Sequence, residues 1–462
     1  MNLMPRRKKM SITTELGEFI NTSVLTDFPQ EAQDAAKIAI LDCIACMLAG
    51  SQEPIADILT KNALFNGGNE HSTVATKNFK TSAQEAALIN GAMAHALDYD
   101  DVTEGIKVHP SVFLLPGALA LGELHQVSGS QILLSYLIGF EVACSIGQGL
   151  SEAYFDDLGW HPTGPLGALG AGATAAAVLN LASELCSKTL SLSASQASGL
   201  RQNFGSMAKP FHPGLACKAG VLSAQLANSG FTADDNILEG RFGFLRAFSG
   251  GNNFNPSNIL NSLKETNHMI ESGVEIKKYP CCGSSHLSLD AMFKILADRQ
   301  LEPTDIDSIT SWVDFDPPRS LVHSNPTSSL EGKFSMEYLL SAAIIDHEIG
   351  LDSFSDSKIQ RESIKNLMSK VTMQRHPGNE GKQSWLEGYH QVEIKLKNGD
   401  TVKDVAERNY VGALRGVTKE DVIQKFDDCS SRVLPKDKAE KIKQIILDLE
   451  NTDNIRSLTS LL

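Results

Sequence analysis

The segment PTGPLGALGAGATAAAVLNLAS, from Pro162 to Ser183, is the most informative part of this 462-residue sequence for its architecture. It contains no charged residue, and it is long enough to cross a bilayer as a helix. Its residues are mainly Gly and Ala rather than Leu, Ile or Phe, so the segment is only weakly hydrophobic. Small side chains suit close packing between helices, and we therefore predict a buried helical segment in a soluble protein.

Helical patterns dominate residues 1–272. Phe28-Pro29 begins a long helix that Gly50 ends, because proline suits the first turn of a helix and glycine suits its C-terminal cap. Ser82 is placed to cap a second helix. The same apolar spacing predicts helices over 112–124, 131–145, 174–185 and 220–229. Strand patterns are scarce, so this region is predicted to be all-α.

The pattern changes at residue 273. A β-branched and aromatic run over 309–315 predicts a strand, and alternating apolar residues over 390–407 predict a hairpin with a type I′ turn at Asn398-Gly399. One helix is expected within this region, over 334–347, and helical patterns resume over 419–426 and 439–449. We therefore predict a mostly α protein in which a smaller α+β domain, residues 273–407, is inserted into a large all-α helical domain, residues 1–272 and 408–462.

The charge balance excludes one large class of function. Lys and Arg number 41 against 55 Asp and Glu, which gives a net charge of −14. Nucleic-acid binding needs a basic surface, so we expect no nucleic-acid partner. We expect no membrane partner either. An anionic substrate would have to be captured by a few local cations, because the charge of the whole molecule repels it.

The cysteines and the N-terminal segment indicate a reducing compartment. Eight cysteines in a chain of this length form no disulfide framework, and several lie in apolar, Ala-rich segments. The basic run over 6–9 is followed over 11–19 by polar and acidic residues rather than by an apolar stretch. No secretory signal is therefore predicted, and the expected location is cytoplasmic.

An acidic cluster marks the first candidate site. His95 and Asp98 are three residues apart, which predicts a shared helical face, and Asp100 and Asp101 follow. Three carboxylates at the predicted C-terminal end of a helix oppose the helix dipole. Either one aspartate caps the next helix and the others are solvated, or one of them orients a histidine or acts as a base.

Four further segments carry residues suited to acid–base chemistry. His109 and His161 each precede a proline, Lys209 lies beside a proline and an aromatic residue, and Lys277 and His286 lie at the predicted domain junction. Lysines at a domain junction are suited to bind a carboxylate, and a neutral histidine can accept a proton. Each residue also has a purely structural interpretation, as a satisfied buried histidine or a solvated lysine.

Other chemistries find little support in the sequence. Cys43 and Cys46 lack the strand–turn–helix setting of a redox motif. Cys281 and Cys282 are adjacent, which ligates a single ion poorly even with His286 nearby, and no second pair is suitably spaced. The sequence contains no GxSxG, Walker or dinucleotide motif. These observations favour acid–base chemistry on a carboxylated small molecule, with no metal and no organic cofactor.

At these same segments the sequence resembles the MmgE/PrpD family, which includes 2-methylcitrate dehydratases, cis-aconitate decarboxylases and iminodisuccinate epimerases. The matching motifs lie at 90–91, 95–101, 109–110, 160–161, 209 with 214–220, 240–244, 277–286, 335–343 and 458–462. The resemblance implies a helical domain, a smaller lid domain that corresponds to 273–407, a homodimer, and an active site in the cleft between the domains. It implies no metal or organic cofactor.

The resemblance also implies roles for individual residues. Those that match catalytic positions are Asp98, His109, His161 and Lys209. Those that match substrate-binding positions are Lys277, Cys282 and His286. Lys209 and Lys277 would hold carboxylates, His109 or His161 would carry the proton, and Asp98 would position or polarise one of these histidines.

The function implied is a cofactor-independent lyase that acts on a di- or tricarboxylate by dehydration or decarboxylation, with proton transfer at a carbon next to a carboxylate. The alternatives are an isomerase that epimerises an iminodisuccinate-like dicarboxylate and a non-catalytic homologue. The sequence departs from the animal decarboxylases at Val102, where they have Thr, and at Cys282, where they have His. One extra residue also lies between Asp98 and His109.

Overall fold

The computed structural model describes residues 10–151, 153–251, 253–380, 388–408 and 413–462. The basic run over 6–9 therefore lies outside the described residues. We call the first group of helices, together with the last three, the helical body. Its α-helices are α1 (Ile12–Thr22), α2 (Gln30–Gly50), α3 (Pro54–Asn66), α4 (Ala83–His95), α5 (Ser111–His125), α6 (Gly129–Gln148), α7 (Ala153–Asp156), α8 (Pro165–Val178), α9 (Ser183–Ala194), α10 (Ala208–Asn228), α11 (Phe244–Phe248), α12 (Pro256–Glu265), α13 (His268–Glu271), α20 (Lys419–Ser431), α21 (Lys436–Leu447) and α22 (Arg456–Thr459).

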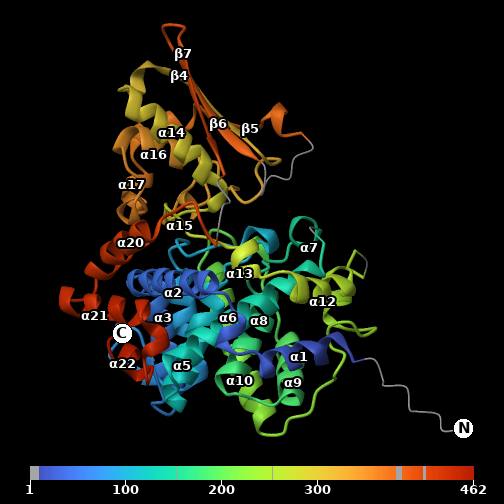
Figure 1. Cartoon of the computed structure of the whole chain (residues 1–462). Helices are drawn as coiled ribbons and strands as arrows, with labels where there is room; N and C mark the ends of the chain where they lie inside the picture. The colour runs from blue at the N-terminus through green and yellow to red at the C-terminus, as the bar shows by residue number, and fades with distance from the viewer. Residues whose placement is uncertain (1–9, 152, 252, 381–387, 409–412) are drawn as a thin grey trace, which may run out of the picture.

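The remaining part, the sheet region, lies above the helical body in Figure 1 and packs α14 and α16 against a four-stranded sheet. Its elements are α14 (His286–Asp298), β4 (Ile306–Val313), α15 (Ser329–Gly332), α16 (Met336–Asp346), α17 (Asp356–Ile359), α18 (Glu362–Met368), β5 (Val371–Arg375), β6 (Tyr389–Leu396) and β7 (Thr401–Glu407). The strand order is β5-β4-β6-β7. Strand β4 runs parallel to β5 and antiparallel to β6, and β6 pairs antiparallel with β7.

Short elements complete the chain. Two small sheets pair β1 (Ser72–Val74) with β2 (Phe79–Thr81), and β3 (Val274–Glu275) with β8 (Leu414–Arg415). The 3-10 helices are η1 (Leu25–Asp27), η2 (Glu104–Ile106), η3 (Arg201–Asn203), η4 (Gly283–Ser285), η5 (Pro303–Asp305), η6 (Leu351–Ser353), η7 (Pro377–Asn379) and η8 (Leu449–Asn451). The prediction of a mostly α fold with a smaller α+β part is confirmed.

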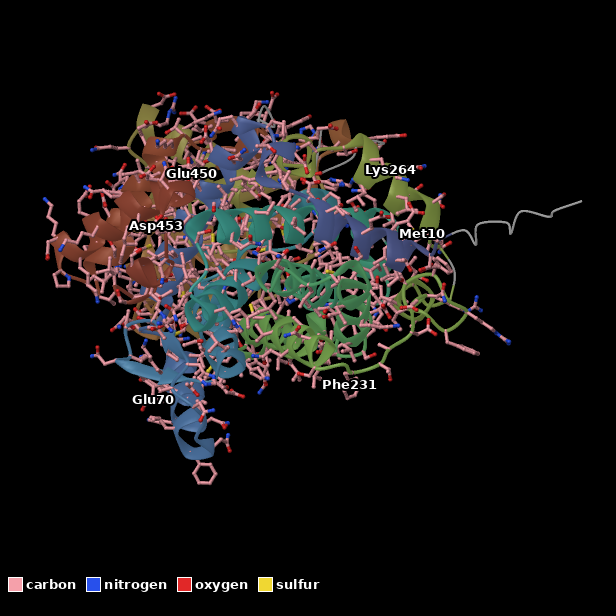
Figure 2. All side chains as sticks on the ribbon, turned by 60° about the horizontal axis from the view of Figure 1, so that its bottom comes forward. Met10, Glu70, Phe231, Lys264, Glu450 and Asp453 are labelled. Atoms are coloured by element: carbon pink, nitrogen blue, oxygen red, sulfur yellow. The ribbon has the colours of Figure 1, made fainter. Side chains whose placement is uncertain are left out.

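Two large hydrophobic cores underlie this arrangement. The larger core takes residues from 16–276 and again from 413–462, whereas the smaller core takes residues from 281–406. The last helices therefore complete the core that the first helices begin, with α20 and α21 packed against α2. Figure 2 brings the bottom of Figure 1 forward and shows Glu450 and Asp453 in this C-terminal part of the helical body. Glu450 pairs with Lys37 of α2 at 2.8 Å.

The small residues of α8 allow the close packing that the sequence predicts. Every residue of α8 is buried. A Cβ added to Gly220 of α10 would lie 2.4 Å from the carbonyl carbon of Ala171, so only glycine permits this approach of the two backbones. Among the described residues, α6 is long and apolar enough to span a membrane, but 83% of its most apolar 18-residue window is buried inside the structure, as in a core helix.

Four local predictions need correction. The helix expected over 174–185 is two helices, because Asn180 adopts a left-handed conformation and the amide of Leu181 closes the end of α8 on the carbonyl of Ala176 at 3.1 Å. Helix α10 begins at Ala208, well before residue 220, and therefore contains Lys209. The turn between β6 and β7 is not type I′, because Gly399 has a positive φ and Asn398 does not.

The fourth correction concerns α4, which ends at His95 rather than continuing through Asp98. Asp98 has a φ of 52°, in the left-handed region, and its amide bonds to the carbonyl of His95 at 3.1 Å. The two side chains therefore do not share a helical face. His95 instead contacts Asp100.

Candidate active site

A cavity between the helical body and the sheet region collects most of the residues that the sequence singles out. Its lining comes from the turn after α4, the loop before α5, the segment before α8, the first turn of α10, the segment 277–284 and the sheet region. The lining residues are Asp98, Val102, Lys107, His109, Phe155, His161, Phe204, Lys209, Lys277, Cys282, Gly283, Ser284, Arg319, Ser320 and Phe334. Six of the seven predicted site residues are among them, and His286 is not.

Asp98 is the carboxylate around which two ammonium groups of this cavity gather. Its Oδ1 atom forms ion pairs with the Nζ atoms of Lys209 and of Lys277, the latter at 3.0 Å. Burial alone would raise the pKa of the Asp98 carboxyl, but the two ammonium groups outweigh it and hold this pKa well below its usual range. Burial would likewise lower the pKa of Lys277, and the carboxylates of Asp98 and Asp100 reverse this and raise it. Asp98 and Lys277 are therefore charged at neutral pH.

Asp100 orients two histidines. Its carboxylate lies 2.8 Å from Nδ1 of His95 and 3.0 Å from Nδ1 of His109. Burial lowers the pKa of His95 to about 3 and also lowers that of His109, although Asp100 opposes both shifts. Both rings are therefore neutral at pH 7 in the free protein. Nε2 of His109 lies 4.0 Å from Oδ1 of Asp98, so this nitrogen faces the charged centre of the cavity.

A second histidine pair borders the first. Nδ1 of His161 lies 3.0 Å from Nδ1 of His212, which lies in α10 one turn after Lys209. One of these nitrogens must donate a hydrogen and the other must accept it. Burial lowers the pKa of His161 well below its usual value and that of His212 to about 4, with Lys209 adding to both shifts. His161 therefore also enters the cavity as a neutral ring.

By distance alone, three of these rings could hold a metal ion. His95, His109 and His161 each offer a ring nitrogen within 4.8 Å of the others, and a second such set joins His95 and His109 with the carboxylates of Asp98 and Asp100. Asp98 is already paired with both lysines. However, the ammonium groups of Lys209 and Lys277 adjoin the same cluster and act on the same histidines. Two fixed positive charges beside the rings favour an anion over a divalent cation. The donor set therefore fits acid–base chemistry on an anion better than it fits a metal centre.

His286 is placed differently from the other predicted residues. It is the first residue of α14, and its Nε2 atom lies 3.3 Å from the carbonyl oxygen of Cys281. Its ring packs edge-on against Tyr279, and burial lowers its pKa to about 3. It lines a separate cavity with Glu407 and Asp290 rather than the cavity that Asp98 lines, although the charges of Lys277 and Asp98 still act on its ring.

Several lining residues were missed by the sequence analysis. Arg319 reaches the cavity from the turn after Pro317-Pro318, and three aromatic residues, Phe155, Phe204 and Phe334, contribute apolar walls. His95 and His212 lie in motifs that the sequence showed, but nothing in their spacing revealed Asp100 or His161 as partners. The Pro-Pro turn after the predicted strand was the available signal for Arg319.

Comparison with known proteins identifies the family of this chain. The model of the MmgE/PrpD N-terminal domain matches residues 14–257, and that of the MmgE/PrpD C-terminal domain matches residues 279–451. The chain is 28% identical to the cis-aconitate decarboxylase of Homo sapiens over 464 residues, which cover 98% of this chain and 94% of that protein. It is 27% identical to the enzyme of the same name from Mus musculus (92% and 88% covered) and 25% identical to that from Aspergillus terreus (98% and 96% covered). The chain belongs to the MmgE/PrpD family.

Proposed function

We propose that this protein is a lyase that removes a carboxylate from a tricarboxylate such as cis-aconitate. The charge of the cavity carries this proposal. Four of the described lining residues are cationic, Lys107, Lys209, Lys277 and Arg319, against one carboxylate, Asp98. The whole molecule has a net charge of −14, whereas the lining of this cavity is positively charged. A locally positive cavity is suited to bind a small polyanion. The names of the relatives support decarboxylation among the reactions of the family.

The residues suggest how the reaction proceeds. Lys209 and Lys277 bind carboxylates of the substrate and stabilise the negative charge that develops next to them. The bond between one carboxylate and its neighbouring carbon breaks, carbon dioxide leaves, and the electron pair stays on that carbon or its allylic partner. A proton then adds to the carbon that carries this electron pair. The reaction consumes one proton per turnover, which is taken up from solvent.

His109 is our choice for the proton carrier. Its Nδ1 lies 3.0 Å from the Asp100 carboxylate, and its Nε2 lies 4.0 Å from Oδ1 of Asp98 on the cavity side. In the free protein burial lowers its pKa, so the ring is neutral. A bound polyanion would raise that pKa and let the ring take up the proton that it delivers. His161 is the alternative carrier, and its contact with His212 leaves its other nitrogen available.

Dehydration and epimerisation begin instead with removal of a proton from a carbon next to a carboxylate, and the neutral histidines of the cavity are suited to accept it. Val102 and Cys282 line the cavity, and both depart from the residues of animal decarboxylases that the sequence resembles. These two departures keep a 2-methylcitrate-like substrate, or an iminodisuccinate-like substrate, as the second candidate.

Proton NMR of the purified protein with cis-aconitate in deuterium oxide tests the proposal. Decarboxylation predicts itaconate with one deuterium at the protonated carbon. Hydrated, citrate-type products would show a dehydratase instead. If cis-aconitate is unchanged, 2-methylcitrate and iminodisuccinate follow in the same assay, and deuterium at the α-carbon of iminodisuccinate without bond cleavage would show an epimerase. No change in all three would contradict an active lyase or isomerase of this class.

The assembly stays a proposal that rests on the resemblance, and the location stays a proposal that rests on the cysteine usage and on the residues of the N-terminal segment. We expect a homodimer in the cytoplasm. The helix α3 carries exposed apolar side chains, Ile58, Leu64 and Phe65, with Phe65 90% exposed. Sedimentation of the purified protein measures the oligomeric state, and a monomer at micromolar concentration would contradict the dimer.

A further inference from the structure

We propose that two buried lysines outside the cavity lining, Lys333 and Lys425, are positioning residues that hold Asp98 in its working conformation. The importance of Asp98 rests on the proposed function. The geometry of the contacts around Asp98 does not depend on that function. Both lysines act through backbone carbonyls next to Asp98.

Three consecutive carbonyl oxygens around Asp98 each accept a hydrogen bond from a lysine ammonium group. Lys333 Nζ donates to the carbonyl of Leu97 at 2.8 Å, Lys277 Nζ donates to that of Asp98 at 2.8 Å, and Lys425 Nζ donates to that of Tyr99 at 2.6 Å. The three lysines come from three separate segments, before α14, after α15 and within α20. All three side chains are buried.

The backbone at Asp98 needs such support. Its φ of 52° is in the left-handed region, which is unfavourable for a residue with a Cβ atom. The turn also follows the C-terminal end of α4, where the helix dipole disfavours carboxylates. Three ammonium groups on successive carbonyls oppose that dipole and fix the turn. They explain why an aspartate, rather than a glycine, is tolerated here.

Lys333 and Lys425 also hold the segment that carries Lys277 and Cys282. Lys333 Nζ donates a second hydrogen bond to the carbonyl of Pro280 at 3.0 Å, and the backbone carbonyl of Lys333 accepts from the amide of Cys282 at 3.0 Å. Lys425 Nζ donates a second bond to the carbonyl of Lys277 at 3.1 Å. Each lysine thus bridges the Asp98 turn and the 277–282 segment, and together they set the separation of Asp98 from Lys277.

The surroundings of the two ammonium groups differ. Lys425 pairs with the buried Asp42 at 2.6 Å and lies over the ring of Tyr99. Lys333 lies over the ring of Phe354 at 4.3 Å, with Glu53 as a more distant carboxylate. Lys333 can therefore be replaced without leaving a directly paired carboxylate alone, whereas replacement of Lys425 would strand Asp42.

Lys333→Met is the decisive variant, because methionine keeps the length of the side chain and removes its donors. The control is Lys37→Met. Lys37 is also buried, but it pairs with Glu450, and its contacts lie away from the Asp98 turn. Positioning predicts that kcat of Lys333→Met falls by about 10- to 100-fold while KM changes by less than about threefold, because Lys333 does not line the cavity. Lys37→Met should keep wild-type values.

Amide hydrogen exchange gives a second readout that requires no turnover. The amides of Asp98 and Val102 bond to the carbonyls of His95 and Glu275 in the native turn. They should exchange at least about tenfold faster in Lys333→Met than in the wild type, and at the wild-type rate in Lys37→Met. The double variant Asp42→Asn/Lys425→Met, which removes both charges of the buried pair, should show the same acceleration.

The outcomes separate this inference from the proposed function. If the wild type turns over none of the tested carboxylates, the proposed function fails, and hydrogen exchange still decides the inference. Unchanged exchange at Asp98 and Val102 in both lysine variants would overturn it. So would a Lys333→Met protein whose KM rises while kcat is unchanged, because that result would mean substrate binding rather than positioning.

Discussion

His109 lies between two buried carboxylates with different partners. Asp98 shares its charge with Lys209 and Lys277, so it belongs to the part of the cavity that receives an anion. Asp100 instead contacts two imidazoles and no lysine among the described ion pairs. A carboxylate that contacts Nδ1 fixes the tautomer and the orientation of the ring. The two aspartates therefore divide the tasks of charge balance and ring orientation.

The first prediction concerns the ring of His109. His109→Gln keeps a polar side chain but cannot carry a proton, so kcat should fall by about 10²- to 10⁴-fold with little change in unfolding temperature. Steady-state kinetics with the substrate found by NMR provide the measurement. His125→Gln, at an exposed histidine on α5, is the control and should be unaffected. Wild-type kcat in His109→Gln would assign the proton transfer to another group.

The second prediction concerns Asp101, which accepts hydrogen bonds from the amide and the hydroxyl of Ser111. Burial, with the nearby Asp42 carboxylate adding to it, raises the pKa of Asp101 from 3.8 to about 8. Between these values the folded protein keeps the proton and the unfolded chain has released it. The contribution of Asp101 to stability therefore falls as pH rises through this window, by about 1.4 kcal/mol per pH unit.

Asp101→Asn removes this dependence, because the amide does not titrate. The free energy of unfolding of the variant relative to the wild type should therefore increase between about pH 5 and about pH 7, by about 1.4 kcal/mol per unit. Urea unfolding of both proteins at the two pH values measures it. Equal pH slopes for the two proteins would mean that Asp101 is ionised in the folded state.

At the scale of elements, the approach of α8 and α10 is the most sensitive contact. A Cβ at Gly220 would lie 2.4 Å from the carbonyl carbon of Ala171 and 2.6 Å from the amide nitrogen of Gly172, both backbone atoms that cannot rotate away. Gly220→Ala should therefore destabilise the protein by about 1–3 kcal/mol or more, despite the higher helix propensity of alanine. Thermal unfolding provides the measurement.

Gly105→Ala is the control for this change, because an added Cβ at Gly105 meets no atom within 4 Å. Its free energy of unfolding should stay within about 0.5 kcal/mol of the wild type. If Gly220→Ala and Gly105→Ala have the same free energy of unfolding, α8 and α10 separate more easily than their packing indicates.

The elements themselves were largely predictable because their signals are local. Ser82 caps α4 as expected, and the strand, the hairpin and the long helix after Pro29 occur where the sequence placed them. Two of the four errors lie where a single residue ends a helix, and the other two concern the start of α10 and the turn between β6 and β7. Asn180 and Asp98 both adopt left-handed conformations, and such conformations depend on bonds that only the folded chain supplies. The apolar, Ala-rich patterns that precede these two residues do not indicate where the left-handed conformations occur.

The site was predictable only in part. The motifs pointed to Asp98, His109, His161, Lys209, Lys277 and Cys282, which all line one cavity. Whether they act as proposed stays a prediction. The carbonyl contacts of Lys333 and Lys425 were invisible in the sequence, because each joins residues more than 50 positions apart. Hydrogen bonds to backbone carbonyls also leave no pattern in an amino-acid sequence, because nearly every residue offers the same carbonyl.

At the scale of the whole molecule, the helical body depends on its last helices. Residues beyond 413 contribute many fully buried side chains to the larger core. These include Phe426, Ile442, Ile446, Leu449 and Ile455, all 0% exposed. Each buried side chain of this size contributes about 1.5–3 kcal/mol, and their sum is comparable to the net stability of a typical domain, about 5–15 kcal/mol.

Ending the chain after Glu407 should therefore abolish the native fold of the helical body, although every residue from 10 to 276 is retained. We expect loss of the near-ultraviolet circular dichroism signal and of a cooperative thermal transition. A truncated chain with a native spectrum and a cooperative transition would show that the first helices form a stable core alone.

This division of one core between two distant stretches of sequence has a consequence for biosynthesis. During translation, α2 emerges long before α20, and the intervening sheet region alone takes on the order of ten seconds to make. Throughout that interval the nascent chain exposes the apolar face that α20 and α21 later cover, and Asp98 lacks the ammonium group of Lys425. The growing chain therefore exposes this apolar face for longer than a chain whose core comes from one continuous stretch, and its active site is complete only after α20 has been made.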